Sequence, residues 1–305
     1  MKFKTSAIAL AVAGVVATPM AAQADIYASA RVGVESYDTG GVSDFRMRSF
    51  GSRFGARSET DLGNGMTGFG RYEWDVDFAD HNEDSDNDID IRHRYVGIKG
   101  DFGSITIGQT YHTFYNHVVG PLDNPWWASG YAMVNYNGRQ DGAVTYAGGA
   151  GAVTFGASLF FLREAEEDAP DEIEVGLSFG IGDMTLGIAA QTTETTQGSA
   201  GTDDAIVGVT LSGIAAGSVT MGFGVMTQDE DSSIVADIGI GNFIVHFETL
   251  SSDAGDNDPT MIMLGYTQSL GRKTTAWYEY VSYDDDTVSD NDEDILRAVL
   301  KYDIE

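Results

Sequence analysis

The stretch YEWDVDF, residues 72–78, decides the fold class of this chain. Its bulky apolar side chains stand at every second position, and acidic residues stand between them. A period of two places the apolar series on one face of a β-strand and the acids on the other. The same alternation returns at 89–95, where His93 and Tyr95 extend the apolar series, and at 173–181. The sequence therefore predicts strands with one apolar face and one polar or charged face.

Composition supports an all-β fold for the whole chain. Glycine makes up 38 of the 305 residues, a share of about 12% against a usual level of roughly 7%. Each glycine inside a helix costs about 1 kcal/mol, so this content disfavours helices. Sixteen strands are expected, near 25–37, 45–60, 66–78, 88–99, 103–111, 139–147, 153–163, 173–182, 184–194, 205–213, 218–228, 233–241, 243–252, 260–269, 275–283 and 293–304.

The connections between these strands fall into two classes. Those after strands 1, 3, 7, 9, 13 and 15 are expected to be long and mostly acidic, and those between them are short and glycine-rich. In an antiparallel meander every second connection emerges at the same end. The pattern therefore predicts one long-looped rim and one tight-turned rim, as in transmembrane barrels. A sandwich with Greek-key crossings has no reason to produce it.

One connection differs from the other long ones. The 27 residues 112–138 carry several aromatic side chains and one acid. A barrel of sixteen strands encloses more space than its own side chains fill. We therefore expect this loop to fold inside the barrel and narrow it.

Charge and cysteine content exclude several classes of function. The chain has 17 basic and 47 acidic residues, a formal net charge of −30, and no cysteine. Nucleic acid is therefore not an expected partner, because phosphate binding needs a basic face. Disulfide frameworks, thiolate zinc sites and cysteine nucleophiles are excluded as well.

The first 24 residues are expected to be a cleaved signal peptide. Lys2 and Lys4 precede an uncharged stretch, and small residues stand before Asp25, where cleavage is predicted. The apolar core is about 11 residues long, too short for a permanent membrane helix, which takes roughly 20. The second predicted unit is the β-barrel domain, residues 25–305.

Three segments together resemble the general diffusion porins of Gram-negative bacterial outer membranes. They are SRFGARSETDLGNGMTGFGRYEWDV from Ser52 to Val76, RYVGIKGDFGSITIGQTY from Arg94 to Tyr111, and GRQDGAVTY from Gly138 to Tyr146. The resemblance implies a 16-stranded antiparallel transmembrane β-barrel, a homotrimer, with an inward-folded third external loop. It also implies passive diffusion of ions and small hydrophilic solutes through water, and outer-membrane lipid and lipopolysaccharide as further partners.

The resemblance also assigns residues to a pore constriction. The wall cluster matches Arg53 in SRFG, Arg92 before YVGIKG, and Arg139 in GRQDGAVTY, with a looser match at Arg31 in ASARVG. Glu73 in GRYEWD matches a wall acid of the family.

On the loop, Asp123 in GPLDNP matches an acid that faces this wall in the family. Trp126 stands where several relatives carry a second acid, so basic groups are expected to outnumber acids at the narrowing. Strand parity adds Arg57 and Arg94 as further residues of the pore wall, because both stand on the expected inward series.

Less specific interpretations stay open at this level. The arginines can pair with Glu59, Glu73 or Asp90 simply to solvate the wall. The run Asp84–Asp88 has carboxylates at alternate positions, as calcium loops do, but lacks the glycine and distant glutamate of an EF-hand. A secreted soluble β-sandwich with calcium-binding acidic loops is the alternative function.

No cofactor and no enzymatic activity are expected. The five histidines lack the spacing of a metal site. The pair His112 and His117 on the long loop is the exception, but it has no third ligand. No Gly-x-Ser-x-Gly motif of a serine hydrolase occurs. The histidines are His81, His93, His112, His117 and His246.

The chain ends in Glu305 rather than the aromatic residue common in the family, although an outward apolar row from Leu296 to Ile304 is expected beside it. Outward aromatic residues at the lipid boundary are predicted at Trp74, Tyr95, Tyr146 and Tyr302.

Overall fold

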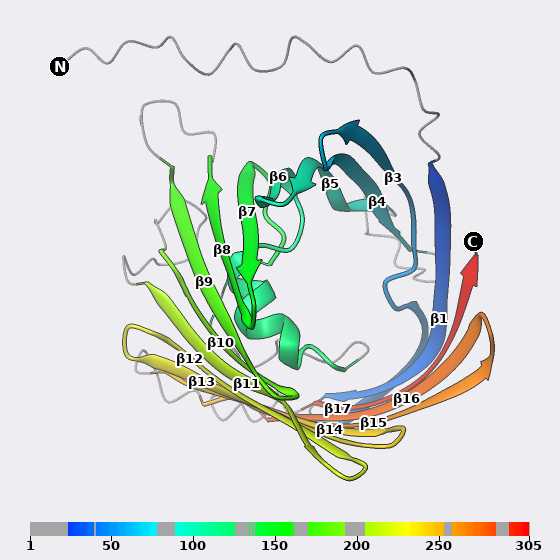
Figure 1. The fold of residues 1–305 in the computed structure, drawn as a ribbon. Coiled ribbons are helices and arrows are strands. Elements are labelled where there is room, and N and C mark those ends of the chain that lie inside the picture. Colours follow the sequence, from blue (N-terminus) through cyan, green and yellow to red (C-terminus); the bar gives the residue numbers. More distant parts are fainter. Residues whose placement is uncertain are drawn as a thin grey trace.

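The strands form one closed ring, seen in the computed structural model of Figure 1. The structure describes residues 24–39, 41–77, 89–125, 134, 136, 138–161, 170–192, 205–252, 258–284 and 293–304. No helix in these ranges is long and apolar enough to cross a membrane.

Seventeen strand segments make up the sheet, and every pairing is antiparallel. Their bounds are β1 Asp25–Thr39, β2 Val42–Ser49, β3 Arg53–Gly63, β4 Met66–Val76, β5 Ile89–Gly100, β6 Gly103–Gln109, β7 Ala143–Ala150, β8 Val153–Phe160, β9 Glu172–Ile181, β10 Met184–Gln191, β11 Ile206–Ala216, β12 Val219–Gln228, β13 Asp231–Ile240, β14 Phe243–Ser251, β15 Thr260–Gly271, β16 Thr274–Asp284 and β17 Glu293–Ile304. A π-helical turn η1, Tyr115–Val119, and a 3₁₀ turn η2, Gly120–Leu122, lie between β6 and β7.

The seventeen segments amount to sixteen barrel strands. Segments β2 and β3 both pair with β1, one along each half of it, so together they occupy a single place in the ring. The ring closes where β1 pairs with β17, from Ala28 opposite Ile304 to Thr39 opposite Glu293. The predicted 16-stranded antiparallel barrel is thus confirmed. The alternative of a β-sandwich is wrong, because the described strands close into one continuous sheet and do not form two stacked layers.

The two rims differ as the sequence predicts, with one exception. On one rim the strands are joined by turns such as Leu62–Met66, where Asn64 has a φ of 54° and Gly65 a φ of 75°. On the other rim longer connections follow β4, β6, β8, β10, β14 and β16. The prediction of a long loop after the first strand is wrong, because β1 runs to Thr39 and β2 begins at Val42. Pairing between β1 and β2 extends into this expected loop and leaves only residues 40 and 41 between the two strands.

Large apolar side chains cover the outer face of the ring. Phe223 and Val225 of β12 are 45% and 46% exposed, whereas their neighbour Met226 points inward and is 1% exposed. The predicted outward row at the C-terminus is confirmed, with Leu296, Leu300, Tyr302 and Ile304 all exposed. The described strands close into one ring, which is the condition for a sheet to lie in hydrocarbon.

Two irregularities change the inward face relative to the sequence prediction. Residues Phe50–Ser52 separate β2 from β3, so the inward series changes from even to odd numbers within the expected strand 45–60. In β5, Glu73 lies opposite His93 and Trp74 lies opposite Ile91, which leaves Arg92 as a bulged residue.

The bulge at Arg92 reverses the faces predicted beyond it. Tyr95 lies opposite Arg71 on the inner face, so its predicted place at the outer lipid boundary is wrong. Arg94 lies opposite Tyr72, whose side chain is on the outer face, so the predicted inward parity of Arg94 is wrong. A bulge inserts one residue, and each later side chain then changes face. The stacked ring pair of Phe54 and Trp74 lies on the outer face, as predicted for Trp74.

The turns η1 and η2 lie within the ring of strands in Figure 1 and contact β9 to β13. Thr210 of β11 donates a hydrogen bond of 2.7 Å to the carbonyl oxygen of Val118. Of the expected loop 112–138, this first part is described. Trp126 lies outside the described residues, as do the run Asp84–Asp88 and residues 1–23 of the expected signal peptide.

Candidate functional site

Arginine side chains gather on the inner face of β1, β3 and β5. Arg92 makes ion pairs with Glu73, 3.2 Å from Nε to Oε1, and with Asp75, 3.1 Å from Nη1 to Oδ2. Arg53 lies 3.9 Å from Glu73. Arg31 interacts electrostatically with Arg92, and Arg53 with both of them. The structure therefore brings together three of the four predicted wall arginines around one acid.

Glu73 is the centre of this group and is fully buried. Tyr27 donates a hydrogen bond of 2.8 Å to Oε2, and Arg71 donates a second bond to the same oxygen. Arg71 also donates to the hydroxyl oxygen of Tyr27, at 2.7 Å. A buried carboxylate is stable only when paired and hydrogen-bonded. Glu73 therefore offsets part of the positive charge and fixes the positions of the guanidinium groups. Arg71 was not predicted, although it shares the inward parity of Glu73.

Arg139, the fourth predicted arginine, connects this wall to the loop. Its guanidinium carbon lies 5.1 Å from the ring centre of Tyr111, and it interacts electrostatically with Arg92. Burial and Arg92 together lower the pKa of Arg139. Tyr111 stacks on Tyr115, with ring centres 3.9 Å apart and planes 12° from parallel.

Tyr115 extends the connection to the predicted loop acid. Its hydroxyl donates a hydrogen bond of 2.6 Å to Oδ2 of Asp123. Burial raises the pKa of Tyr115, and the charge of Asp123 raises it further, so this phenol keeps its proton. A chain of contacts therefore runs from Arg139 on the basic side, through two stacked tyrosines, to Asp123 on the loop.

The remaining strands of the barrel carry acids. Within the strand ranges given above, no Lys or Arg occurs in β6 to β16. The inner face of β9, β13 and β14 instead holds four buried acids. These are Glu172, Glu174, Asp237 and Glu248. The barrel interior is thus divided into a basic side and an acidic side.

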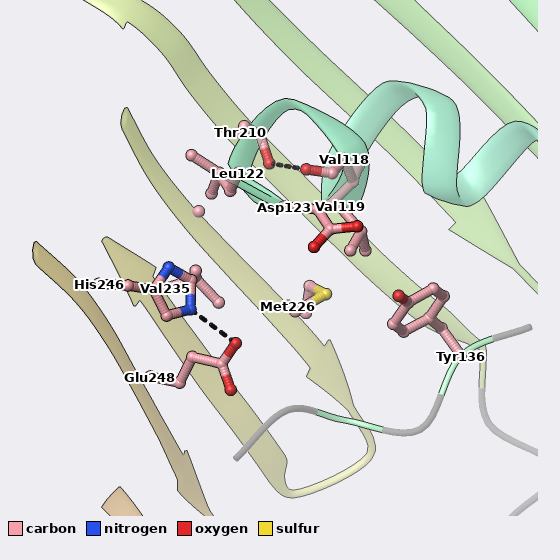
Figure 2. Close-up of a pocket in the computed structure, with 11 residues that line it drawn as sticks. Val118, Val119, Leu122, Asp123, Tyr136, Thr210, Met226, Val235, His246 and Glu248 are labelled. Atoms are coloured by element: carbon pink, nitrogen blue, oxygen red, sulfur yellow. Dashed lines mark hydrogen bonds and ion pairs between the residues drawn. The ribbon is translucent and has the colours of Figure 1, made fainter. Parts of the chain in front are cut away.

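Figure 2 shows the loop against this acidic side. A cavity of about 60 Å³ separates Asp123 and Tyr136 of the loop from His246 and Glu248 of β14. Nε2 of His246 lies 2.8 Å from Glu248, and Nδ1 contacts Asp237. His246 therefore stands between two carboxylates. Sequence reasoning missed this cluster, because Asp237 and His246 come from different strands and only register aligns them.

The loop is attached to the acidic side by hydrogen bonds from both its backbone and its side chains. Phe114 donates its backbone N–H to Glu174 at 3.0 Å, and Asn124 donates its amide to Asp237. His117 Nδ1 lies 2.6 Å from the hydroxyl of Ser178. Burial lowers the pKa of His117, so its ring is neutral at neutral pH.

Two further predicted residues lie apart from the cluster. Arg57 lies on the inner face but is 64% exposed and pairs with Asp25 at 3.5 Å. Arg94 pairs with Asp141 at 2.6 Å on the outer face.

A second basic group was not predicted. Arg46, Arg48 and Arg297 surround the buried Glu35, and the Nε of Arg297 lies 2.5 Å from it. The prediction of 45–60 as one regular strand places Arg46 and Arg48 on the outer face. The change of the inward series at Phe50–Ser52 turns both side chains inward. Among the described residues, no group of three or more His, Asp or Glu side chains is arranged to hold a metal ion.

The comparison with known families accounts for nearly the whole chain. Residues 7–305 match the family model described as Gram-negative porin. The chain belongs to the Gram-negative porin family. Its resemblance to porins in three sequence segments is therefore confirmed, and the match extends across both halves of the barrel.

Curated relatives of this porin share part of its length. It is 34% identical over 116 residues to the major outer membrane protein P.IB of Neisseria lactamica, covering 34% of this chain and 32% of that protein. It is 31% identical over 121 residues to the outer membrane porin PhoE of Enterobacter cloacae, covering 37% and 34%. Each match thus spans about a third of the relative's length. The family and the names of these relatives indicate that this porin is located in the bacterial outer membrane.

Solved structures share its fold over nearly the full chain. The anion-selective porin from Comamonas acidovorans superposes with a TM-score of 0.74 at 14% identity, covering 93% of this chain and 100% of that chain. The Salmonella typhi OmpF complex with daunomycin gives a TM-score of 0.74 at 16% identity, covering 92% and 97%. At such identities the likeness shows the fold alone.

Proposed function

We propose that this porin forms a water-filled channel for passive diffusion of ions and small hydrophilic solutes. The observation that carries the proposal is the charge division of the barrel interior. Arg31, Arg53 and Arg92 line one side, and the loop bearing Asp123 covers the acidic side opposite. A solute passing between them meets a lateral electric field that acts on its charge, while the narrowing made by the loop limits its size. Passage of this kind involves no catalytic step.

The segment from His112 to Asn124 is the proposed constriction element. It is attached to β9, β11 and β13 by the hydrogen bonds described above, so it occupies space that the barrel side chains leave unfilled. The predicted roles of Arg139 and Glu73 belong to the same proposal. Arg139 contacts the tyrosine stack that holds Asp123, and Glu73 limits the positive charge of the wall.

We also propose that the chain assembles as a homotrimer in contact with outer-membrane lipid and lipopolysaccharide. Among solved structures of the same fold, OmpT of Vibrio cholerae is described in a trimer form. The exposed apolar residues of the outer face supply a surface for lipid and for neighbouring copies. Chemical cross-linking of the detergent-extracted protein tests this part, with bands of three chains expected and a single-chain band contradicting it.

Reconstitution tests the channel itself. Liposomes loaded with a large polysaccharide swell when small sugars enter through a pore, so swelling rates for sugars of increasing size report both the pore and its size limit. We expect fast swelling for the smallest sugars and a steep decline with size. Liposomes that contain correctly folded protein and swell no faster than empty ones would contradict the proposal.

A further inference from the structure

Glycines on the inner face of the acidic side lie directly beneath the loop. One or two occur on each of five neighbouring strands, β8 to β12, always on the inward series. They are Gly156, Gly176, Gly187, Gly208, Gly222 and Gly224. We call these six residues the glycine seat. Glycine inside a strand weakens it and often marks a place where another backbone approaches closely.

A side chain at any of several seat positions would collide with the loop. A Cβ at Gly208 would lie 2.6 Å from Val118, and one at Gly224 would lie 2.7 Å from Leu122. Such separations are shorter than real Cβ contacts, which lie beyond about 3.0 Å. At Gly187 the collision is with the backbone carbonyl oxygen of His117. A flexible side chain can turn away, but there the loop backbone itself would have to move.

The polar groups that hold the loop come from the same strands. Ser158 stands two residues from Gly156 and accepts the backbone N–H of Thr113 at 3.1 Å. Thr210 stands two residues from Gly208 and donates to Val118. A spacing of two puts each polar side chain on the same face as its glycine. The glycines thus allow close approach, and their neighbours supply the hydrogen bonds that need it.

The outer face of the same strands carries no such pattern. Val207 and Val209 flank Gly208, and Phe223 and Val225 flank Gly224, all large and exposed. The six glycines of the seat thus lie on the face that the loop covers, while large side chains flank them on the outer face.

From these contacts we infer that the glycine seat consists of positioning residues that set how far the loop extends into the lumen, and hence the width of the channel. The inference rests on the proposed channel function. It assigns the aperture to wall residues that do not touch the solute. Adding a methyl group at Gly187 pushes the loop backbone away from the wall and toward the pore axis, which narrows the passage.

The first test compares Gly187→Ala with Gly180→Ala in single-channel recordings. Gly180 lies on the inner face of β9, and a Cβ there meets only Ala152 at an ordinary distance of 3.6 Å. We expect Gly187→Ala to lower the conductance below the wild-type value and Gly180→Ala to leave it unchanged. Equal conductance of wild type and a correctly folded Gly187→Ala variant overturns the inference. If the wild type itself conducts no current, the channel function has failed, and the next test still examines the seat.

The second test does not depend on conduction or on a crowded variant. The chain has no cysteine, so the pair Thr113→Cys and Ser158→Cys introduces the only thiols. The two hydroxyl oxygens lie 2.8 Å apart, within reach of a disulfide once sulfur replaces oxygen. We expect a mild oxidant to link the pair in the purified barrel, detected as faster gel migration that reductant reverses. Two thiols that stay unlinked under the oxidant would show that the loop does not lie against the strands of the glycine seat, which overturns the inference.

Discussion

The carboxylate of Glu73 joins the side chain of Arg92 at 3.2 Å while also accepting hydrogen bonds from Tyr27 and Arg71. Glu73 of β4 thus holds Arg71 of the same strand and Arg92 of β5 in place. The basic side of the lumen is an ordered array for this reason. Without this acid, the arginine side chains would repel each other and extend separately into the water of the lumen.

Replacing Glu73 by Gln is expected to make the channel more anion-selective and the barrel less stable. The substitution removes the one fully buried negative charge among Arg53, Arg71 and Arg92. Breaking a buried pair by removing one partner costs about 3 kcal/mol or more. Reversal potentials in a salt gradient and the temperature at which the folded band disappears from gels measure both effects. Glu59→Gln is the control, since Glu59 is 62% exposed and pairs only with Lys99 among the described ion pairs; an equal effect of both substitutions would contradict the assignment.

Replacing Arg92 by Gln is expected to shift selectivity toward cations. Arg92 interacts with Arg31, Arg53 and Arg139, so its loss lowers the positive potential of the whole cluster. Arg57→Gln is the matched control, because Arg57 is on the same inner face but exposed and paired with Asp25. Salt screens the charge of an exposed residue such as Arg57 beyond about 8 Å at physiological ionic strength, so its loss should affect selectivity less. Identical reversal potentials for both variants would place the selective region elsewhere.

Replacing Tyr115 by Phe is expected to loosen Asp123 and to remove a sensitivity to alkali. The lost hydrogen bond is worth about 1 kcal/mol. The pKa of Tyr115 is raised in the folded chain, by burial first and then by Asp123, above its ordinary value of 10.0. Protonated Tyr115 therefore contributes fully to the stability of the folded chain below pH 10.0, and this contribution is lost as the pH rises further. Unfolding measured between pH 9 and 11 should show a steeper decline for the wild type than for the variant; parallel curves would contradict this.

His112 is expected to make the loop sensitive to acid. The His112 ring is fully buried, and its centre lies 4.7 Å from the ring centre of Phe160. Burial lowers the pKa of His112 from 6.5 to about 4. The unfolded or detached state binds a proton more readily, so stability falls as the pH falls from 6.5 toward 4. The loss over that window is on the order of 3 kcal/mol. Heat-induced unfolding at pH 7 and pH 4.5, with His112→Phe as the comparison, measures it. A wild type that loses no more stability than the variant would rule out this role.

The sequence predicts the barrel well because its main signal is local. Alternation at 72–78 and the spacing of the turns depend on neighbouring residues alone, and they place all sixteen strands to within a few residues. Bulges are not visible in this way. The extra residue at Arg92 moves Tyr95 inward and Arg94 outward, and the break at Phe50–Ser52 brings Arg46 and Arg48 inward. The acidic cluster at His246 was equally hidden, since it depends on the register between β13 and β14.

Current through the purified barrel in a planar bilayer, recorded across a potassium chloride gradient, tests the charged, water-filled lumen most directly. The account predicts discrete conductance steps without any energy source. It also predicts a mild cation preference at low salt, because the strongly acidic chain concentrates cations at the mouth, and that preference should fade as salt screens the rim. Folded protein that gives no conductance steps would contradict the channel, and firm anion preference at every salt concentration would contradict the proposed balance of charges.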